Sequence, residues 1–428
     1  RNRDTMNIYE EFQWRGMLYD ASEGLQETFL KESLIGYIGF DPTAASLHVG
    51  HLLQIMQLMR LQQYGHKPIA LVGGGTGMIG DPSGKTQERQ LLSKEQIAFN
   101  VEGIRGQLGR FLDFEHTSNP AMLVNNLDWL SQISMIDFLR DVGKHFTVNY
   151  MLAKESVKRR FEEGDGISFT EFSYMLLQSY DFLELYNRYH CTLQMGGSDQ
   201  WGNIVAGAEL IRKVSGARVH ILVFPLVMTS AGIKFGKTEA GTIWLDANLT
   251  SPFRFYQFWI NTDDRDAIKY LKFFTMLNQA EIAELEAAFV RAPEKREAQR
   301  RLAQEVTRMV HGEYELRKAM QASHILFGGE IADLDARDVL DIFGDVPSSD
   351  VPATSFEGEG LPIVDAVIAC GFAPSRGAAR RLIEGGGIYV NNRRVSDAQA
   401  TLGRSLLIDG QYLVMRKGAR EYHLLRVV

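Results

Sequence analysis

The sequence predicts an α/β protein: a doubly wound parallel sheet in the first half, then a helical region and a small α+β domain. Two observations support this fold class. Short apolar runs alternate with segments of helical periodicity through the first half, as they do in strand–helix–strand units. The pattern changes to helices alone from residue 251 to about residue 327, and a polar stretch with two prolines follows at residues 345–352.

Individual elements follow from the same patterns. Four short segments have the composition of buried strands: residues 34–40, 68–72, 121–124 and 219–223. Residues 51–63 carry apolar side chains at helical spacing, and residues 280–292 and 294–310 are charged, amphipathic helices. Near the end of the chain we expect a helix over residues 373–383 and a strand–turn–strand over residues 388–395.

Length and composition set limits on the class of protein. The chain has 428 residues, of which 45% are hydrophobic, enough for two or three domains with a large core. It has no apolar run of membrane-spanning length and no secretory signal at its start, so we expect no membrane partner. Its two cysteines, Cys191 and Cys370, cannot build a disulfide framework, which fits a cytoplasmic location.

Charge is distributed unevenly along the chain. The net charge is −7, but residues 371–428 hold ten Lys and Arg against four Asp and Glu, a net of +6. The remainder therefore carries −13. A basic tail on an acidic body favours a polyanionic partner for the last domain, although a solvated basic surface is an equal alternative on charge alone.

Two histidines open the helix that follows the first strand. At a helix N-terminus, the imidazole N–H groups of His48 and His51 and free backbone N–H groups would meet at one anion-binding position. Gly50 between them lets a base or a phosphate approach the backbone. No third ligand stands at metal spacing, so we expect no protein-bound metal. The simple alternative is a pair of surface histidines at a helix cap.

A second basic motif lies in a loop much later in the chain. Lys234 and Lys237 flank Gly236, and Gly232 and Gly241 flank the whole motif. Two lysines with glycines around them can form a mobile cationic clamp that closes on a phosphorus centre and then leaves. An exposed lysine loop is the common alternative for this motif taken alone.

A glycine run after the second predicted strand leaves another function open. Residues 75–80 match GxGxxG, the fingerprint of dinucleotide-dependent oxidoreductases. Asp81 and Pro82 follow at once, however, and place a carboxylate and a helix-interrupting proline where a pyrophosphate would dock. We therefore interpret the run as a tight turn that aims Asp81 inward.

Polar residues at two places could line a small-molecule pocket. Tyr174, Gln178 and Asp181 share one face of a predicted helix, although this could also be the helix's solvent face. The glycine turn at residues 196–201 delivers Asp199 and Gln200, and an Asp at this place in an α/β fold often accepts from a ribose hydroxyl.

Together, these motifs resemble one family in register along nearly the whole chain. The histidine and lysine motifs are similar to the HIGH and KMSKS signatures of class I aminoacyl-tRNA synthetases. The remaining likeness, to bacterial-type tyrosyl-tRNA synthetases, lies in residues 39–43, 80–85, 167–174 and 196–201. The resemblance implies a Rossmann-like catalytic domain over 1–246, a helical domain on the anticodon side of the tRNA over 247–335, a linker over 336–358 and an RNA-binding domain over 359–428.

The resemblance also implies a role for each residue of the tyrosine site. Tyr37 and Asp181 would hydrogen-bond the phenolic hydroxyl of L-tyrosine. Asp81, Tyr174 and Gln178 would hold its α-ammonium group, and Gln200 would lie near its carboxylate.

A second set of residues would bind ATP. Asp41, Gly50, His51 and Asp199 would contact the adenosine part, while Thr43 and His48 would hold the γ-phosphate region. Four residues would reach the pyrophosphate: Lys85, Arg89, Lys234 and Lys237. ATP is then a substrate, and Mg²⁺ accompanies the pyrophosphate. Ile38 departs from the pattern, because relatives often carry a Cys there that contacts the ribose.

The resemblance further implies tRNA(Tyr) as a partner and a homodimer as the assembly. The last domain is similar to a small RNA-binding module found in a ribosomal protein and in pseudouridine synthases. Its candidate tRNA contacts are Arg376, Arg380, Arg381, Arg393 and Arg394, since arginines suit phosphates on structured RNA. Two alternatives remain, an oxidoreductase based on residues 75–80 and a non-catalytic RNA-binding protein with the same fold.

Overall fold

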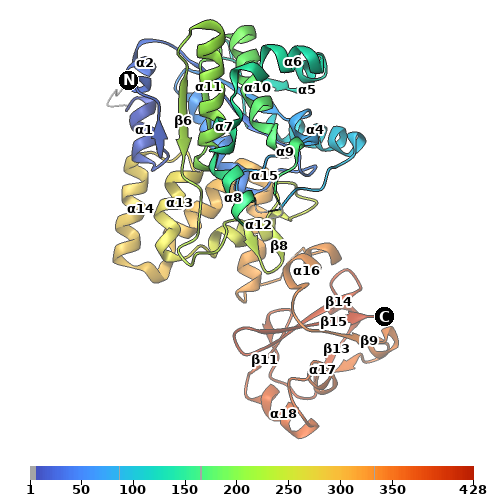
Figure 1. Ribbon diagram of the computed structural model, residues 1–428. Coiled ribbons are helices and arrows are strands. Elements are labelled where there is room, and N and C mark those ends of the chain that lie inside the picture. The colour runs from blue at the N-terminus through green and yellow to red at the C-terminus, as the bar shows by residue number, and fades with distance from the viewer. Residues whose placement is uncertain (1–5, 86, 164–165, 332) are drawn as a thin grey trace. The chain divides into compact units, whose positions relative to one another are not determined.

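The computed structural model describes residues 6–85, 87–163, 166–331 and 333–428, and it divides into two compact units (Figure 1). The first unit comprises residues 1–249 and 262–302, and the second comprises residues 250–261 and 303–428. Each unit is described by itself below.

The first unit is built on a six-stranded sheet in the order β1-β6-β5-β2-β3-β4. The five strands from β6 to β4 are parallel, and only the edge strand β1 is antiparallel. The strands are β1 (Asp20–Ala21), β2 (Ile35–Phe40), β3 (Lys67–Val72), β4 (Met122–Asn125), β5 (Leu193–Gly197) and β6 (His220–Phe224). The predicted doubly wound parallel sheet is thus confirmed.

The first unit also contains thirteen helices within the described residues, and several of them, such as α3 and α11, pack against this sheet. They are α1 (Ile8–Trp14), α2 (Leu25–Lys31), α3 (Val49–Gln63), α4 (Lys94–Leu108), α5 (Leu127–Leu130), α6 (Met135–Asp141), α7 (Val148–Leu152), α8 (Glu155–Glu163), α9 (Phe169–Phe172), α10 (Tyr174–Tyr189), α11 (Trp201–Ser215), α13 (Asp264–Phe274) and α14 (Gln279–Arg291). A two-stranded hairpin, β7 (Lys237–Thr238) with β8 (Gly241–Thr242), carries the lysine motif.

The second unit combines helices with a second sheet. Its helices are α12 (Pro252–Ile260), α16 (Ala336–Phe343), α17 (Ile363–Ala369) and α18 (Arg376–Glu384), and it also receives most of α15 (Glu297–Leu326). Helix α15 is interrupted at Gly312, whose φ of 88° is left-handed. The sheet has the order β12-β11-β14-β15-β9: β9 (Ser348–Val351), β11 (Ile388–Val390), β12 (Arg393–Arg394), β14 (Tyr412–Lys417) and β15 (Glu421–Val427).

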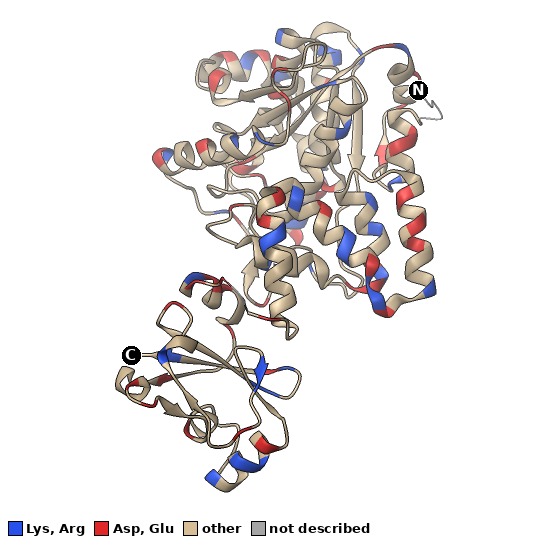
Figure 2. Cartoon of the chain, turned by 180° about the vertical axis from the view of Figure 1, so that it is seen from behind, with Lys and Arg blue, Asp and Glu red and all other residues tan. Residues whose placement is uncertain are grey.

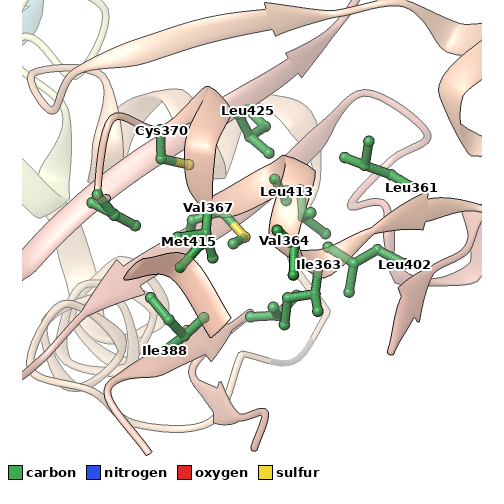
Figure 3. Packing of buried hydrophobic residues seen from close by; sticks show 14 of the residues in the cluster. Leu361, Ile363, Val364, Val367, Cys370, Ile388, Leu402, Leu413, Met415 and Leu425 are labelled. Atoms are coloured by element: carbon green, nitrogen blue, oxygen red, sulfur yellow. The ribbon is translucent and has the colours of Figure 1, made fainter. Parts of the chain in front are cut away.

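Two further strands, β10 (Leu361–Pro362) and β13 (Thr401–Leu402), pair beside the core of the last domain. Figure 3 shows this core, in which helix α17 contributes Val364 and Val367 and the strands contribute Leu413 and Leu425. Cys370 belongs to the same core, and both cysteines are free and buried.

The segment expected to be a linker, 336–358, is folded instead. It contains helix α16 and strand β9, which pairs in parallel with β15. Strand β9 is polar and is flanked by Pro347 and Pro352, so its composition resembles that of a linker. The expected helical domain, 247–335, is likewise divided between the two units. Its helix α12 buries Phe253 against Phe343 of α16 and Leu424 of β15.

The structure also alters one local prediction. Gly196 and Gly197 are the last residues of strand β5, not part of a turn. A short 3₁₀ segment then follows at Ser198–Gln200. Among the helices of the described residues, none combines the length and the apolar composition needed to cross a membrane.

Candidate active site

The predicted site residues lie at the carboxyl ends of the parallel strands. Strand β2 lies between β3 and β5, so the strand order reverses there, which is the place where α/β sheets form ligand crevices. Asp41 follows β2, Asp81 lies in the connection after β3, and Asp199 follows β5. Helix α10 passes the same region and carries the other three predicted pocket residues, Tyr174, Gln178 and Asp181. The predicted pocket residues are thus gathered from four elements.

Tyr37 and Asp181 are the most deeply buried of the predicted tyrosine-site residues. Their side chains are 1% and 2% exposed. Burial, and then the charge of Asp181, raises the pKa of the Tyr37 phenol well above its usual value. Among the described residues, the Tyr37 hydroxyl has no hydrogen-bond partner. A buried hydroxyl without a partner is costly, so this atom is suited to a polar group of a ligand.

Two residues that the sequence did not single out hold the Asp181 carboxylate. Trp129 Nε1 donates to Asp181 Oδ1 at 2.8 Å, and Asn126 Nδ2 donates to Asp181 Oδ2 at 3.0 Å. Burial raises the pKa of Asp181 to about 8, against the lowering effect of these two hydrogen bonds. Asn126 and Trp129 lie just after strand β4, at the same sheet edge, and that position was the one available signal.

A second carboxylate, Asp41, joins strand β2 to helix α10. Tyr174 Oη donates to Asp41 Oδ2 at 2.6 Å, and Thr76 Oγ1 donates to Oδ1 at 2.7 Å. Burial raises the pKa of Asp41 to about 6. Asn126 Nδ2 also lies 2.9 Å from Thr76 Oγ1, so one chain of hydrogen bonds links Asp41 with Asp181. The predicted adenosine and ammonium contacts, Asp41 and Tyr174, are therefore direct partners here.

Asp81 and Gln200 are direct hydrogen-bond partners. Gln200 Nε2 donates to Asp81 Oδ2 at 2.8 Å, and the backbone N–H of Ser83 donates to Oδ1 at 2.9 Å. Lys154 lies near Asp81 and hydrogen-bonds Asn203, and burial lowers the pKa of this lysine to about 8. Among the described residues, the buried Oε1 of Gln178 has no partner and remains available to a donor.

The two histidines of the first motif cap helix α3 reciprocally. The backbone N–H of Gly50 donates to His48 Nδ1 at 3.0 Å, and the N–H of His48 donates to His51 Nδ1 at 3.2 Å. Both Nδ1 atoms are therefore acceptors, and the neutral rings carry their proton on Nε2. Burial lowers the pKa of His48 to about 4 and that of His51 to about 3, so both rings are uncharged at neutral pH.

One expectation about this helix end is wrong. The backbone N–H groups of the first turn are not free: those of His48 and Gly50 bind the two rings, Val49 N–H donates to Ile243, and His51 N–H donates to His48. The donors left at this position for a ligand are thus the imidazole Nε2–H groups.

The two basic motifs lie against each other. Residue 48 pairs with Trp244 in an antiparallel bridge, and their rings are 5.9 Å apart. A Cβ atom on Gly236 would lie 2.8 Å from Val49 Cγ2, so glycine permits this approach at its φ of 83°. The charges of Lys234 and Lys237 add to burial in lowering the His48 pKa. The histidine motif and the lysine motif are therefore in contact in the structure, although they are far apart in the sequence.

Four cations converge on the same region. Partial burial lowers the pKa of Lys85, and the charges of Arg89, Lys234 and Lys237 lower it further. Arg89 also lines a cavity together with Asp41, Thr43 and Gly80. Such a concentration of positive charge next to two imidazole N–H donors is suited to a polyphosphate.

The glycine run at residues 75–80 does not have the geometry of a dinucleotide site. The segment after β3 forms a single 3₁₀ turn, Thr76–Met78, and not the long helix that such a site needs. A Cβ atom on Gly77 would lie 2.7 Å from Pro42 Cδ, and one on Gly75 would lie 2.7 Å from Leu130 Cδ1. The run packs tightly against its neighbours, which counts against the oxidoreductase alternative.

Two observations concern possible metal ligands and one predicted ribose contact. Over residues 6–428, except those the structure leaves undescribed, no group of three or more His, Cys, Asp or Glu is placed to hold a metal ion. Ile38, the departure noted above, is 1% exposed and offers no hydrogen bond.

The predicted RNA contacts lie in the second unit. All five arginines are exposed, and Figure 2 shows positive charge along helix α18 at the bottom of the view. Arg376 pairs with Asp365, and Arg393 pairs with Glu330. Arg394 stacks on the ring of Tyr389 and donates to its hydroxyl at 2.7 Å. Arg380 and Arg381 stand next to each other on α18.

Comparison with known proteins gives two family matches. Residues 30–328 match the family described as tRNA synthetases class I (W and Y). Residues 342–425 match the C-terminal domain described as tyrosine–tRNA ligase SYY-like.

Curated relatives match over almost the full length. The chain is 59% identical to a tyrosine–tRNA ligase of Roseiflexus castenholzii, covering 98% of this chain and 99% of the relative. It is 54% identical to one of Geobacillus stearothermophilus, covering 98% and 100%. Among solved structures, a C-terminally truncated mitochondrial tyrosyl-tRNA synthetase of Aspergillus nidulans has a TM-score of 0.69 at 30% identity, covering 76% of this chain and 95% of that one.

Proposed function

Because this chain belongs to the tyrosyl-tRNA synthetases of class I, we propose how its residues divide the work of a tyrosine–tRNA ligase. The chain activates L-tyrosine with ATP and transfers the tyrosyl group to tRNA(Tyr). The observation that carries the assignment of the amino-acid site is the unpartnered Tyr37 hydroxyl beside the Asp181 carboxylate, at the buried end of a crevice.

The tyrosine substrate would enter with its ring first. Its phenolic hydroxyl would donate to Asp181 and accept from Tyr37, which gives the unpartnered hydroxyl a partner. A phenylalanine ligand would leave both buried groups unsatisfied, and this cost is the basis of discrimination. Asp81, Tyr174 and the free Oε1 of Gln178 would hold the α-ammonium group, which is a donor that these acceptors match.

Adenylate formation follows from charge placement. The tyrosine carboxylate attacks the α-phosphorus of ATP in line, and pyrophosphate leaves. A carboxylate is already ionised at neutral pH, so the reaction needs no protein base. The remaining requirement is to stabilise charge on the phosphates, which the Nε2–H groups of His48 and His51 and the four converging cations would do. Thr43 would add a hydroxyl donor, and Asp41 and Asp199 would accept from the adenosine part.

ATP would enter as its magnesium complex. The lysines, Arg89 and the neutral histidines assigned to the polyphosphate are donors and not the oxygen ligands that Mg²⁺ prefers. The ion would therefore be held by the phosphates.

The second unit would bind tRNA(Tyr). Arg380 and Arg381 on α18 and Arg394 beside Tyr389 would contact the phosphate backbone, with Arg376 and Arg393 exchanging their present carboxylate partners for phosphates. This exchange is inexpensive because exposed ion pairs contribute little to stability.

We further propose that the chain assembles as a homodimer through the surface of α6 to α9. Phe138 of α6, Met151 of α7 and Phe172 of α9 share one core cluster, so these helices are neighbours. Their outer residues are apolar and exposed: Met135 is 72% exposed, Ile136 71% and Phe169 73%. A patch of this kind on a folded unit is typical of a subunit interface.

This assembly can be tested by light scattering. Ile136→Glu should convert a dimer to a monomer, because it places a charge in an apolar interface. Val290→Glu on α14 changes an equally exposed residue and is the matched control. A dimer that survives Ile136→Glu would place the interface elsewhere.

The amino-acid site can be tested by calorimetric binding of L-tyrosine and L-phenylalanine. Tyr37→Phe should weaken tyrosine binding and reduce discrimination between the two ligands. Tyr64→Phe removes a hydroxyl of the same kind, which bonds to Glu11 at 2.9 Å outside the pocket, and should leave both affinities unchanged. Equal tyrosine affinity in wild type and Tyr37→Phe would remove Tyr37 from the site.

A further inference from the structure

The segment that joins Asp41 to the histidine motif has no regular structure, yet it must hold Thr43 and His48 in place. Residues 42–47 are neither helix nor strand. A phosphate site on such a segment needs support, because a displacement of about 1 Å can cost on the order of a hundredfold in rate. The support comes from one face of helix α4, which lies outside every sequence motif discussed above.

Three residues of α4 make this face, spaced three and four apart: Asn100, Gly103 and Gln107. Asn100 Nδ2 donates to the carbonyl oxygen of Pro42 at 3.0 Å. Gln107 Oε1 accepts from the N–H of Leu47 at 2.7 Å, and its Nε2 donates to Ser46 Oγ at 2.8 Å. The two side chains thus hold the segment at both of its ends, and they are only 2% and 5% exposed.

Gly103 lies between these two side chains and lets the helix approach the segment. A Cβ atom there would lie 2.0 Å from the carbonyl oxygen of Ala45, far inside van der Waals contact. Because the obstructing atom belongs to the backbone, no side-chain rotation can relieve the clash. Glycine disfavours a helix interior relative to alanine, so its presence here reflects the close approach.

The same contact extends to the segment that follows the lysine motif. Ser46 Oγ, which accepts from Gln107, also accepts from the N–H of Asp246 at 3.3 Å. Leu47 accepts from the N–H of Leu245 at 2.9 Å. Leu245 and Asp246, which follow hairpin β7–β8, therefore hydrogen-bond the same segment that α4 holds.

We propose that the face of α4 formed by Asn100, Gly103 and Gln107 is a positioning surface for adenylate formation. It fixes residues 42–47, and through them sets Thr43 and His48 against the phosphates of ATP. These α4 residues act through the segment and touch no substrate themselves. The inference rests on the proposed function, because it concerns the phosphate end of that same site.

Two glycines of α4 provide a matched test. Gly103→Ala should lower the rate of tyrosyl-adenylate formation about a hundredfold at saturating ATP. The dissociation constant for L-tyrosine should stay within twofold, since Tyr37 and the α10 residues do not rest on this segment. Gly106→Ala makes the same change on the same helix, where nothing lies within 4 Å of the new Cβ, and should leave the rate unchanged.

Gln107→Met is the second variant, because it keeps the side-chain volume and removes both hydrogen bonds without a clash. It should lower the rate at least tenfold with tyrosine binding unchanged, and its thermal midpoint shows that it folds. Both rates are followed by rapid-mixing fluorescence on the full chain.

The outcomes separate the two claims. A wild-type chain without tyrosine-dependent adenylate formation would overturn the proposed function itself. An active wild type in which Gly103→Ala and Gln107→Met both match Gly106→Ala would overturn only the positioning role. A parallel loss of rate and tyrosine affinity would also overturn it, since that result indicates general damage to the fold.

Discussion

Burial, together with the neighbouring charge of Asp181, raises the pKa of the Tyr37 phenol, yet the described residues leave the Tyr37 hydroxyl without a hydrogen-bond partner. The Asp181 carboxylate is turned toward Trp129 and Asn126, which each donate to one of its oxygens. The Tyr37 hydroxyl is therefore available for a hydrogen bond with a polar group of a ligand. A phenolic hydroxyl, which both donates and accepts, completes this arrangement.

Replacement of Asp181 should change the pH dependence of stability. Its pKa is raised to about 8 by burial, from an ordinary value of 3.8. The folded state thus holds this proton more tightly than the unfolded state, so the contribution of Asp181 to the free energy of unfolding is largest below about pH 4 and falls as pH rises through 8. Asparagine does not titrate. The stability of wild type relative to Asp181→Asn should therefore fall between pH 5 and pH 8 in urea titrations, and a constant or rising difference would contradict a raised pKa.

Trp129→Phe should weaken the pocket without entering it. The variant loses the 2.8 Å hydrogen bond to Asp181. In the wild type this hydrogen bond lowers the pKa of the Asp181 carboxyl. Tyrosine affinity should drop roughly tenfold, the size of one buried hydrogen bond. Fluorescence titration with L-tyrosine measures the effect, with Trp14→Phe on helix α1 as the control. Unchanged affinity in Trp129→Phe would mean that Asp181 needs no second donor.

His48→Asn should separate helix capping from phosphate binding. Asparagine is a good N-cap residue, so the amide oxygen can replace Nδ1 as acceptor for the first turn. It has no donor at the position of Nε2–H. The rate of adenylate formation should fall about a hundredfold or more, as when one donor to a developing negative charge is lost, with little change in the thermal midpoint. A normal rate would reduce His48 to a structural cap.

Ile38→Cys should improve ATP binding. Isoleucine at this position offers no hydrogen bond to a ribose, and a thiol is a weak donor. We expect a modestly lower Michaelis constant for ATP in tyrosine-dependent exchange. Identical constants in both proteins would show that a different group serves the ribose here.

Arg380→Glu combined with Arg381→Glu should abolish tRNA charging and spare adenylate formation. Both arginines are exposed on α18, so reversing their charge adds repulsion from phosphates without disturbing a core. A double change to Glu is preferable to truncation at residue 344, which would uncover Phe343 and Phe253 from their partners on β14 and β15. Lys31→Glu on helix α2 is the control, and normal charging by the double variant would move the RNA surface elsewhere.

Sequence reasoning found the parts that local patterns encode. Strand β2, helix α3 and the two basic motifs have apolar periodicity and charged or glycine residues that short windows reveal. The hydrogen bond from Val49 to Ile243, which brings the two motifs together, is visible only in the structure.

Contacts between residues that are distant in the sequence could not be predicted from local patterns. The support of Asp181 by Trp129, and of Leu47 by Gln107, joins residues 52 and 60 positions apart. The polar residues of strand β9 are typical of loops and predict a linker, whereas its strand character comes from its pairing with β15. The prediction of free N–H groups at the start of α3 is wrong because His48 caps the helix. A histidine side chain is not a usual cap, so local sequence patterns do not indicate this role.

The function of this chain depends on which amino acid binds beside Tyr37 and Asp181. Amino-acid-dependent exchange of pyrophosphate into ATP, run with each of the twenty amino acids and without tRNA, measures this directly. Exchange with L-tyrosine alone is the predicted result. Exchange with L-tryptophan in its place would keep the class of enzyme and contradict the assignment of Tyr37 and Asp181, and no exchange with any amino acid would contradict the assignment of the phosphate site.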